Sequence, residues 1–561
     1  MKRTELIALL FLLSIFVGLC FFGQKKNSVT VDEFAHLPAG YYYWQTRDFR
    51  LYAKNPPLIK MSAALPLNLL KPCFEPDLKK FPQTGWLPWF FANDFMVRNR
   101  AEFINIFQAG RLMTILLGSL LGLALFFTAK SRYGRTGAFL SLTAWVFCPE
   151  ALAHSMMATV DIGASLCIFL AVLTLLNYLN KPDWKRTLLA GFCLGLAQLA
   201  KFSSLALLVF YPLAPFFLLW PFRKDRLKIR SFALRSGQVL TMLLLCLIVV
   251  AAGYGFQGLF KKTADFRFQS RLMAEVQKIF RPWPAPFPET YLKGLDGQIR
   301  DMESGEFANY LMGRWYSGVS RKYFPIALIL KVPIPIQLLA LFALALGFRP
   351  GKKRLKFSPE EMLLLAVIAW LLLLFSLKNS LQIGVRYLLP LFPLGLLMTA
   401  RLAKNAGMLR RILTASLMLW LALETIYFYP HYLSYFNEFA GGPKNGHKFL
   451  LDSNLDWGQD LPALADFMKQ NKIDRIELDY FGHADPGIYG VRYQVLGQEP
   501  RLEYAAVSAQ LLFGGKRFFY PMLFVQPPLG GVIVNPEKVI PFQNKKPVGR
   551  AGYSIWIFEN D

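Results

Sequence analysis

Apolar residues fill most of this chain in long blocks, which short polar and basic connections separate. Blocks of this kind approach the ~20 residues that an α-helix needs to cross a hydrocarbon core. The pattern predicts about eleven membrane spans, at residues 6–22, 112–128, 137–152, 162–179, 188–199, 202–220, 239–256, 324–347, 362–377, 387–400 and 412–428. We therefore expect an α-helical polytopic membrane protein.

Basic residues between the blocks predict the orientation. The first block follows Lys2-Arg3 and precedes no small-residue cleavage site, which favours a retained anchor over a signal peptide. Alternate connections collect Lys and Arg, as in the dense stretch 223–230 and at 352–354. Because cytoplasmic loops carry such excess charge, we expect a cytoplasmic N-terminus. An odd number of spans then places loops 24–105 and 257–322 and the tail 430–561 on the outer face.

The tail has a different composition, in which Asp, Asn, Gly and Pro interrupt short apolar stretches. It predicts a helix at 461–470 and strands at 475–480, 502–507, 532–535 and 553–558. We therefore divide the chain into a membrane domain, 1–429, and a small α/β domain, 430–561. The sequence shows no internal repeat, which argues against a transporter built from inverted repeats.

The composition excludes several classes of function. The net charge of +27 lies in short clusters between apolar blocks rather than on a recognition helix, so no nucleic-acid partner is expected. The chain also has no P-loop and no dinucleotide fingerprint. Of its 6 cysteines, only Cys73 and Cys148 fall at or beyond the predicted outer boundary, where they could form a disulfide.

The acidic pair Asp32-Glu33 follows the first predicted span directly. Acids at a membrane boundary are costly, so this pair is the first candidate for chemistry. His36 and the aromatic run 41–44 follow it, which suits an amphipathic helix lying along the outer interface. The alternative is that the acids only cap that helix at its N-terminus.

Further charged residues flank other predicted spans on the same outer side. Asp161 is a candidate for orienting an acceptor or a basic partner, and a helix N-cap is its alternative. The cations can pair with acids or extend to the interface, and together they could receive a lipid phosphate. The candidates for donor phosphate binding are Lys201, Lys331, Arg386 and Tyr387.

A carboxylate beside such cations suits glycosyl transfer from a lipid-phosphate sugar. The acid takes a proton from the attacking hydroxyl, and the cations stabilise the departing phosphate. One base with attack from the opposite face would invert the anomeric carbon. We expect no cofactor and no metal site, since the 5 histidines show no ligand spacing, although Asp32, Glu33, His36 and Asp161 leave a divalent metal open.

Several short motifs, in this order, resemble the protein O-mannosyltransferase-like branch of the integral-membrane GT-C glycosyltransferases. The resemblance covers essentially the whole membrane domain, and the tail resembles that of bacterial phospholipid-carrier-dependent members. The motifs are Asp32-Glu33 with Asn55-Pro56-Pro57-Leu58, Thr159-Val160-Asp161-Ile162-Gly163-Ala164, Leu199-Ala200-Lys201-Phe202, Leu330-Lys331-Val332-Pro333, Gly384-Val385-Arg386-Tyr387-Leu388-Leu389-Pro390 and Asp452-Ser453-Asn454-Leu455-Asp456-Trp457-Gly458-Gln459-Asp460-Leu461.

The resemblance implies a GT-C fold in a bacterial inner membrane, with a polyprenyl-phosphate sugar donor and chemistry on the periplasmic face. It implies that Asp32 is the catalytic base, that Glu33 supports the site and that Asp161 lies near the acceptor. His36 is a further candidate for contacting the acceptor or supporting the site. The acceptor hydroxyl could belong to a protein, a lipid or a polysaccharide. The stretch 452–460 either recognises the acceptor or caps helix 461–470. The rival functions are a transporter of lipid-linked sugars and a non-catalytic scaffold.

Overall fold

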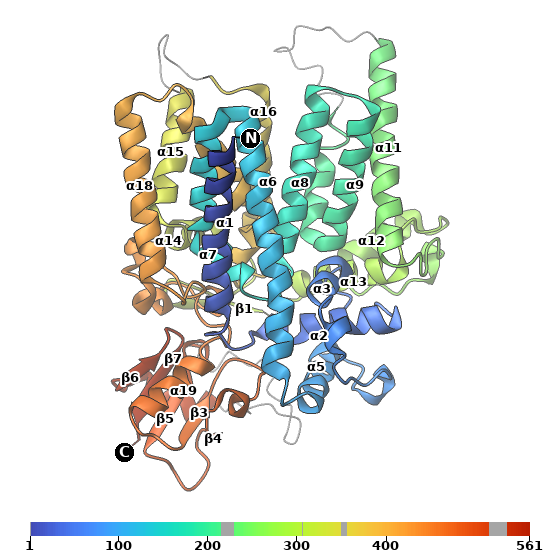
Figure 1. Ribbon diagram of the computed structural model, residues 1–561. Coiled ribbons are helices and arrows are strands. Elements are labelled where there is room, and N and C mark those ends of the chain that lie inside the picture. The colour runs from blue at the N-terminus through green and yellow to red at the C-terminus, as the bar shows by residue number, and fades with distance from the viewer. Residues whose placement is uncertain (1, 215–228, 306, 349–355, 515–535, 561) are drawn as a thin grey trace.

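The computed structural model describes residues 2–214, 229–305, 307–348, 356–514 and 536–560. Long helices run side by side through one part of the molecule, and the tail packs against one end of them (Figure 1). The N-terminus lies toward the opposite end from the C-terminal sheet. The helices of the bundle are α1 (Arg3–Gln24), α6 (Phe103–Val146), α7 (Pro149–Ser155), α8 (Asp161–Asn180), α9 (Trp184–Ala200), α11 (Ile229–Gly253), α14 (Tyr323–Lys331), α15 (Ile334–Phe348), α16 (Pro359–Lys378), α17 (Leu391–Thr399) and α18 (Met408–Tyr427).

Five described helices are long and apolar enough to cross a membrane, namely α1, α6, α8, α11 from Ala233, and α16. The consecutive helices α14 and α15 pass the same test together but are bent by 111°. Other predicted spans are shorter or more polar, such as α9 with 17 residues and α18, which carries Arg410, Arg411 and Glu424. The chain is a multi-pass membrane protein. Most of the predicted cytoplasmic clusters 223–230 and 352–354 lie outside the described residues.

Helix α6 contains the predicted span 112–128 and most of the span 137–152, whose end belongs to α7, and a sharp reversal joins the two. Gly134 has φ +77°, a left-handed conformation that suits glycine because it has no Cβ. On either side of it, the rings of Phe126 and Phe139 lie 5.2 Å apart, and the Trp145 indole N–H donates to the Gly118 carbonyl at 3.0 Å. The two halves therefore run antiparallel, as the separate blocks 112–128 and 137–152 predicted.

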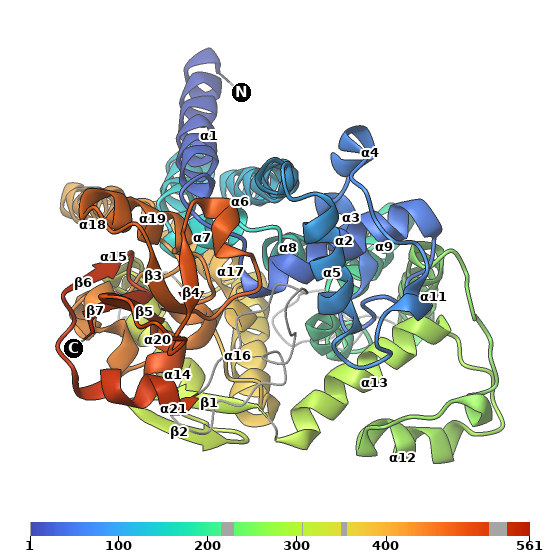
Figure 2. The ribbon, with the colours of Figure 1, turned by 90° about the horizontal axis from the view of Figure 1, so that it is seen from below.

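The two long outer loops fold into short helices and a hairpin at the tail end of the bundle. Figure 2 shows the helices of the first loop, together with α13, on one side of this end and the tail sheet on the other. These elements are α2 (Val31–Thr46), α3 (Pro57–Ala63), α4 (Leu67–Leu70), α5 (Leu87–Arg98), α12 (Arg271–Phe280), α13 (Glu289–Ser304), β1 (Ala308–Leu311) and β2 (Arg314–Ser317).

Helix α2 forms where an amphipathic interfacial helix was predicted. The prediction that its aromatic side chains face a lipid interface is wrong. A capping box between Thr30 and Glu33 starts the helix where expected. However, nearly every side chain from Val31 to Tyr43 is buried, because α3 and α5 pack against it. The packing with α3 is so close that a Cβ at Gly40 would lie 2.0 Å from the Lys60 carbonyl oxygen. The aromatic run therefore belongs to the protein core rather than to a lipid interface.

The tail forms one sheet of five strands in the order β4-β3-β5-β7-β6, with α19 packed beside it. Strand β3 is parallel to β4 and β5, whereas β7 is antiparallel to β5 and β6. The predicted helix 461–470 is confirmed, and the predicted strands 475–480, 502–507 and 553–558 match β3, β5 and β7. The sequence missed the short strands β4 and β6, and 532–535 lies outside the described residues. The elements are α19 (Leu461–Gln470), α20 (Ala509–Leu512), α21 (Pro536–Val539), β3 (Ile476–Asp479), β4 (Tyr493–Val495), β5 (Tyr504–Ser508), β6 (Gly549–Ala551) and β7 (Ile555–Glu559).

Two hydrophobic clusters divide the tail. Its sheet and α19 enclose a small core of their own, which includes Leu464 and Ile557. The segment that precedes α19 belongs instead to the main core of the membrane helices, through side chains such as Tyr432, Leu455 and Trp457. The tail is therefore joined to the membrane domain by buried apolar packing, not by a solvated linker.

The disulfide that the sequence left open between Cys73 and Cys148 is not formed. Cys73 is exposed in the first outer loop, whereas Cys148 is fully buried before α7, and both are free thiols.

Candidate active site

A cavity of about 560 Å³ opens where both outer loops, the connection before α17 and the tail meet. Its walls combine charged and aromatic side chains that are far apart in the sequence. The charged and polar lining residues are Asp32, His36, Lys54, Asn55, Lys201, Gln298, Arg300, Asp301, Arg386 and Asp452, and the aromatic ones are Tyr52, Trp86, Trp89, Phe307, Tyr387, Trp457 and Phe481.

Asp32 lies in the first turn of α2 and its side chain is 20% exposed toward this cavity. One carboxylate oxygen accepts a hydrogen bond from Nη1 of Arg386 at 2.7 Å. Arg386 belongs to a short 3₁₀ helix (Val385–Leu388) that precedes α17. The ion pair therefore joins the first outer loop to a segment 354 positions later in the chain.

Asp161 is fully buried at the start of α8. Its Oδ1 lies 2.6 Å from the ammonium of Lys201, and its Oδ2 lies 3.6 Å from Arg386. The N-cap position belongs to Val160, so the capping alternative does not describe this side chain. Lys201 in turn lies 5.0 Å from the ring centre of Tyr387. The structure thus brings together five of the predicted residues, Asp32, Asp161, Lys201, Arg386 and Tyr387.

Acidic and basic side chains alternate here, with Asp32, Lys201 and Arg386 on the cavity wall and Asp161 buried behind it. The carboxylates of Asp32 and Asp161 are compensated by Arg386 and Lys201, which avoids an uncompensated buried charge. An incoming phosphate can compete with the carboxylates for the cations, and a carboxylate released in this way becomes able to accept a proton. The arrangement therefore suits anion binding next to a base.

His36 lies one helical turn after Asp32, so that both face the cavity. Its Nε2 is 3.5 Å from the side-chain nitrogen of Asn55, and its buried Nδ1 has no partner among the described residues. Burial lowers the pKa of His36 to about 4, although the Asp32 carboxylate opposes the shift. At neutral pH His36 is therefore an uncharged imidazole that can hydrogen-bond to a substrate.

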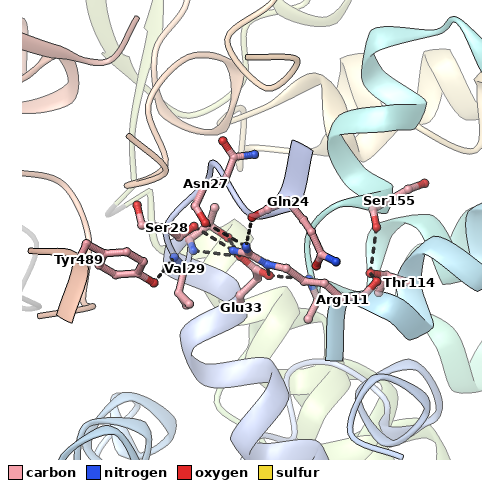
Figure 3. A network of polar contacts seen from close by, with 11 residues as sticks. Gln24, Asn27, Ser28, Val29, Glu33, Arg111, Thr114, Ser155 and Tyr489 are labelled. Atoms are coloured by element: carbon pink, nitrogen blue, oxygen red, sulfur yellow. Dashed lines mark hydrogen bonds and ion pairs between the residues drawn. The ribbon is translucent and has the colours of Figure 1, made fainter. Parts of the chain in front are cut away.

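Glu33 faces away from the cavity, into the network of Figure 3. Its carboxylate accepts two hydrogen bonds from Arg111 of α6, each at 2.8 Å. The backbone N–H groups of Thr30 and Ala158 donate to it as well. Burial alone would raise the pKa of Glu33, but the Arg111 charge and these donors hold it below its usual range. Glu33 thus fixes the start of α2 against the bundle.

Lys331 also lies away from the cavity. Its ammonium is fully buried 3.1 Å from the Glu150 carboxylate. It donates to the main-chain carbonyls of Leu433 and Asn454 at 2.8 and 2.7 Å. Lys331 therefore binds the tail backbone, whereas Lys201 and Arg386 line the cavity.

The sequence did not assign Asp452 and Trp457 to the site, although both lie in the stretch whose role it left open. Both line the cavity, and burial raises the pKa of Asp452 to about 7 against the effect of Arg386.

Asp460 takes the N-cap position of α19 without capping it. Its Oδ2 accepts instead from the backbone of Tyr553 and from Ser554.

Asp456 provides a test through the pH dependence of stability. Burial raises its pKa to about 7, above the ~3.9 of a free Asp, so the folded protein binds this proton more tightly than the unfolded chain does. Its stabilising contribution is complete below pH ~4 and is lost as the pH rises through 7, by at most ~1.4 kcal/mol per unit. We expect Asp456→Asn to flatten the fall in chemical-denaturation midpoint over this range. Asp474→Asn, at a carboxylate that is 80% exposed, should leave the slope unchanged, and an unaltered slope in Asp456→Asn would contradict the assignment.

Among the described residues, no group of three or more His, Cys, Asp or Glu side chains could hold a metal ion. The fold and the cavity define a multi-pass membrane protein with a charged site at one end of its helices.

Residues 85–253 match the family model described as Dolichyl-phosphate-mannose-protein mannosyltransferase. Over these residues the match confirms the predicted resemblance to the protein O-mannosyltransferase-like branch, and the range contains Asp161 and Lys201 but not Asp32 or Arg386. No curated protein matches the chain.

Several solved structures match the chain at low identity. ArnT from Cupriavidus metallidurans bound to undecaprenyl phosphate has 13% identity and a TM-score of 0.49, over 99% of this chain and 98% of that one. The same ArnT in the apo state has 12% identity and a TM-score of 0.45, over 98% and 97%. The oligosaccharyltransferase of Archaeoglobus fulgidus has 15% identity and a TM-score of 0.42, over 76% of this chain and 55% of that one.

Proposed function

We propose that this protein is a glycosyltransferase that moves a sugar from a polyprenyl-phosphate donor to a hydroxyl acceptor. The observation that carries the proposal is the cavity in which Asp32 is paired with Arg386, while Lys201 lines the same cavity. The family model over residues 85–253 supports the donor class, because its description names a dolichyl-phosphate sugar.

In the proposed reaction, Asp32 takes the proton of the acceptor hydroxyl as its oxygen attacks the anomeric carbon. A new bond forms between that oxygen and the carbon, while the bond from the carbon to the phosphate oxygen breaks. The electron pair leaves with the polyprenyl phosphate, whose charge Arg386 and Lys201 stabilise. Attack from the face opposite the leaving phosphate inverts the anomeric carbon.

Tyr387 suggests where the lipid chain reaches the site. It lines the charged cavity and also borders an apolar crevice between α8, α16 and α17. The crevice is lined by Ile168, Leu371 and Phe375, among others. The crevice has a volume of only about 10 Å³, so α8, α16 and α17 would have to separate for a polyprenyl tail to enter beside Tyr387 with its phosphate next to Arg386.

The proposal also covers the sugar, the acceptor and the side of the membrane. The transferred sugar is a mannose-like hexose or a pentose, and the acceptor hydroxyl belongs to a protein, a lipid or a polysaccharide. The site and the tail lie on the periplasmic face of a bacterial inner membrane, which agrees with their position at the end of the bundle opposite the N-terminus (Figure 1). Asp161 and His36 lie near the acceptor.

The test is transfer by the purified protein in lipid, with a panel of polyprenyl-phosphate sugars and hydroxyl acceptors. The expected result is release of free polyprenyl phosphate that requires both an acceptor and the cavity residues. Arg386→Met should abolish it, whereas Arg492→Met, at a tail arginine that is 75% exposed, should not. Movement of the donor across the bilayer without any release would overturn the proposal in favour of transport.

A further inference from the structure

The tail segment 452–457 is interlocked with the segment that carries Arg386. The hydroxyl of Ser453 donates to the Ile383 carbonyl at 2.7 Å and accepts from Nε of Arg386 at 3.1 Å. The Ser453 side chain lies so close to Gly384 that a Cβ at Gly384 would be 2.1 Å from the Ser453 hydroxyl oxygen. One tail side chain therefore binds both the backbone before Arg386 and its guanidinium.

The next tail residue, Asn454, fixes the same segment from a second direction. Its side-chain oxygen accepts from the backbone N–H of Val385 at 2.9 Å, and its nitrogen donates to the Tyr323 hydroxyl at 3.0 Å. The main-chain carbonyl of Asn454 accepts from the buried ammonium of Lys331 at 2.7 Å. Lys331 thus anchors the tail segment, and Glu150 neutralises its charge.

Two more tail residues complete the arrangement at the cavity wall. The guanidinium of Arg386 lies 4.3 Å from the ring centre of Trp457, within the range of a cation–π contact. Asp452 has φ +55°, an uncommon conformation for a non-glycine residue. Its backbone N–H donates to the Gln510 side chain at 2.8 Å, which holds the residue in place. Strain of this kind persists only where the surrounding contacts determine the backbone, and it concentrates at functional sites.

We propose that Ser453, Asn454 and Trp457 are positioning residues that orient Arg386 toward the donor phosphate. The tail therefore forms part of the donor site. This inference rests on the proposed function. A guanidinium has five N–H donors, and within the described part of the chain two hydrogen bonds occupy Arg386, one at Nε and one at Nη1. The Ser453 contact fixes the plane of the group while further donors stay available for phosphate oxygens.

The probe is undecaprenyl phosphate without a sugar, titrated against the full-length protein in detergent micelles. A hydrogen bond to a charged group is worth about tenfold in affinity, so we expect Ser453→Ala to raise the Kd about tenfold. Ser453→Thr, which keeps the hydroxyl, should restore most of the affinity. The matched control is Ser554→Ala, at a buried tail serine that binds Asp460 and does not line the cavity. It should leave the Kd unchanged.

A double-mutant cycle shows whether Ser453 acts through Arg386. Lysine has no Nε–H, so in an Arg386→Lys background the Ser453→Ala change should add no further loss of affinity. Melting temperatures of all variants show whether a loss reflects general destabilisation. An unchanged Kd in Ser453→Ala, or a tenfold loss that persists in Arg386→Lys, would overturn the inference. If the wild-type protein itself does not bind undecaprenyl phosphate, the donor assignment fails, and the inference falls with it.

Discussion

Replacing Asp32 by Asn should lower the rate of sugar transfer by about 10²–10⁴-fold, because a positioned general base contributes about that much. The amide has the size of the carboxyl group and can still accept a hydrogen bond from Arg386, but it cannot take up the acceptor proton. The Kd for undecaprenyl phosphate should therefore change much less than the turnover number. The measurement is a comparison of transfer rate at saturating donor with donor affinity.

The control for this substitution is Asp94→Asn, which removes another carboxylate of the first outer loop. Asp94 pairs with Arg98 on the surface of α5 and does not line the cavity. Its variant should transfer sugar at the wild-type rate. Retention of more than half of the wild-type turnover by Asp32→Asn would remove Asp32 from the chemistry and leave the cavity without its expected base.

Replacing Arg111 by Met should lower the free energy of unfolding by about 3–5 kcal/mol, since removal of one partner leaves a buried charge uncompensated. Arg111 and Glu33 are 2% and 0% exposed. The guanidinium also donates to the carbonyls of Gln24, Asn27 and Ser28, and all three of these hydrogen bonds are lost in the variant (Figure 3). The measurement is the shift of the denaturant midpoint of the purified protein in detergent.

An exposed arginine supplies the comparison for this effect. Arg492 pairs with Asp474 at a surface where the side chains are 75% and 80% exposed, so Arg492→Met should cost less than about 1 kcal/mol. Adding Glu33→Gln to Arg111→Met should recover part of the loss, because it removes the unpaired charge. Equal midpoints for Arg111→Met and Arg492→Met would show that the buried pair does not hold the fold together.

The sequence singled out polar residues that the structure brings together, but it could not show which of them face the cavity. Asp32 and Glu33 are adjacent, and successive residues of an α-helix point about 100° apart, so only one of them faces the cavity. Which one depends on the rotation of α2 against the bundle, and Arg111 decides this by binding Glu33. Lys331 and Lys201 likewise look equivalent in sequence, but only Lys201 lines the cavity.

The environment of α2 shows a second limit of sequence patterns. Its aromatic and small residues suit either a lipid interface or a protein core, because both environments accept the same amphipathic side chains. The structure decides for the core, since α3 and α5 cover the helix. Neither helix carries a signal in the sequence that it packs against α2.

The class of the molecule could be inferred from the order of its residues: apolar blocks of bilayer length, a tail of mixed helix and strand, and acids and cations beside the predicted spans. These properties are local, because they depend on the hydrophobicity and periodicity of neighbouring residues. The folded chain was needed to show that Asp32 pairs with Arg386, that Glu33 and Lys331 are structural anchors and that Ser453 and Trp457 reach the site. Those contacts join segments up to hundreds of positions apart, and their geometry depends on how all the intervening helices pack.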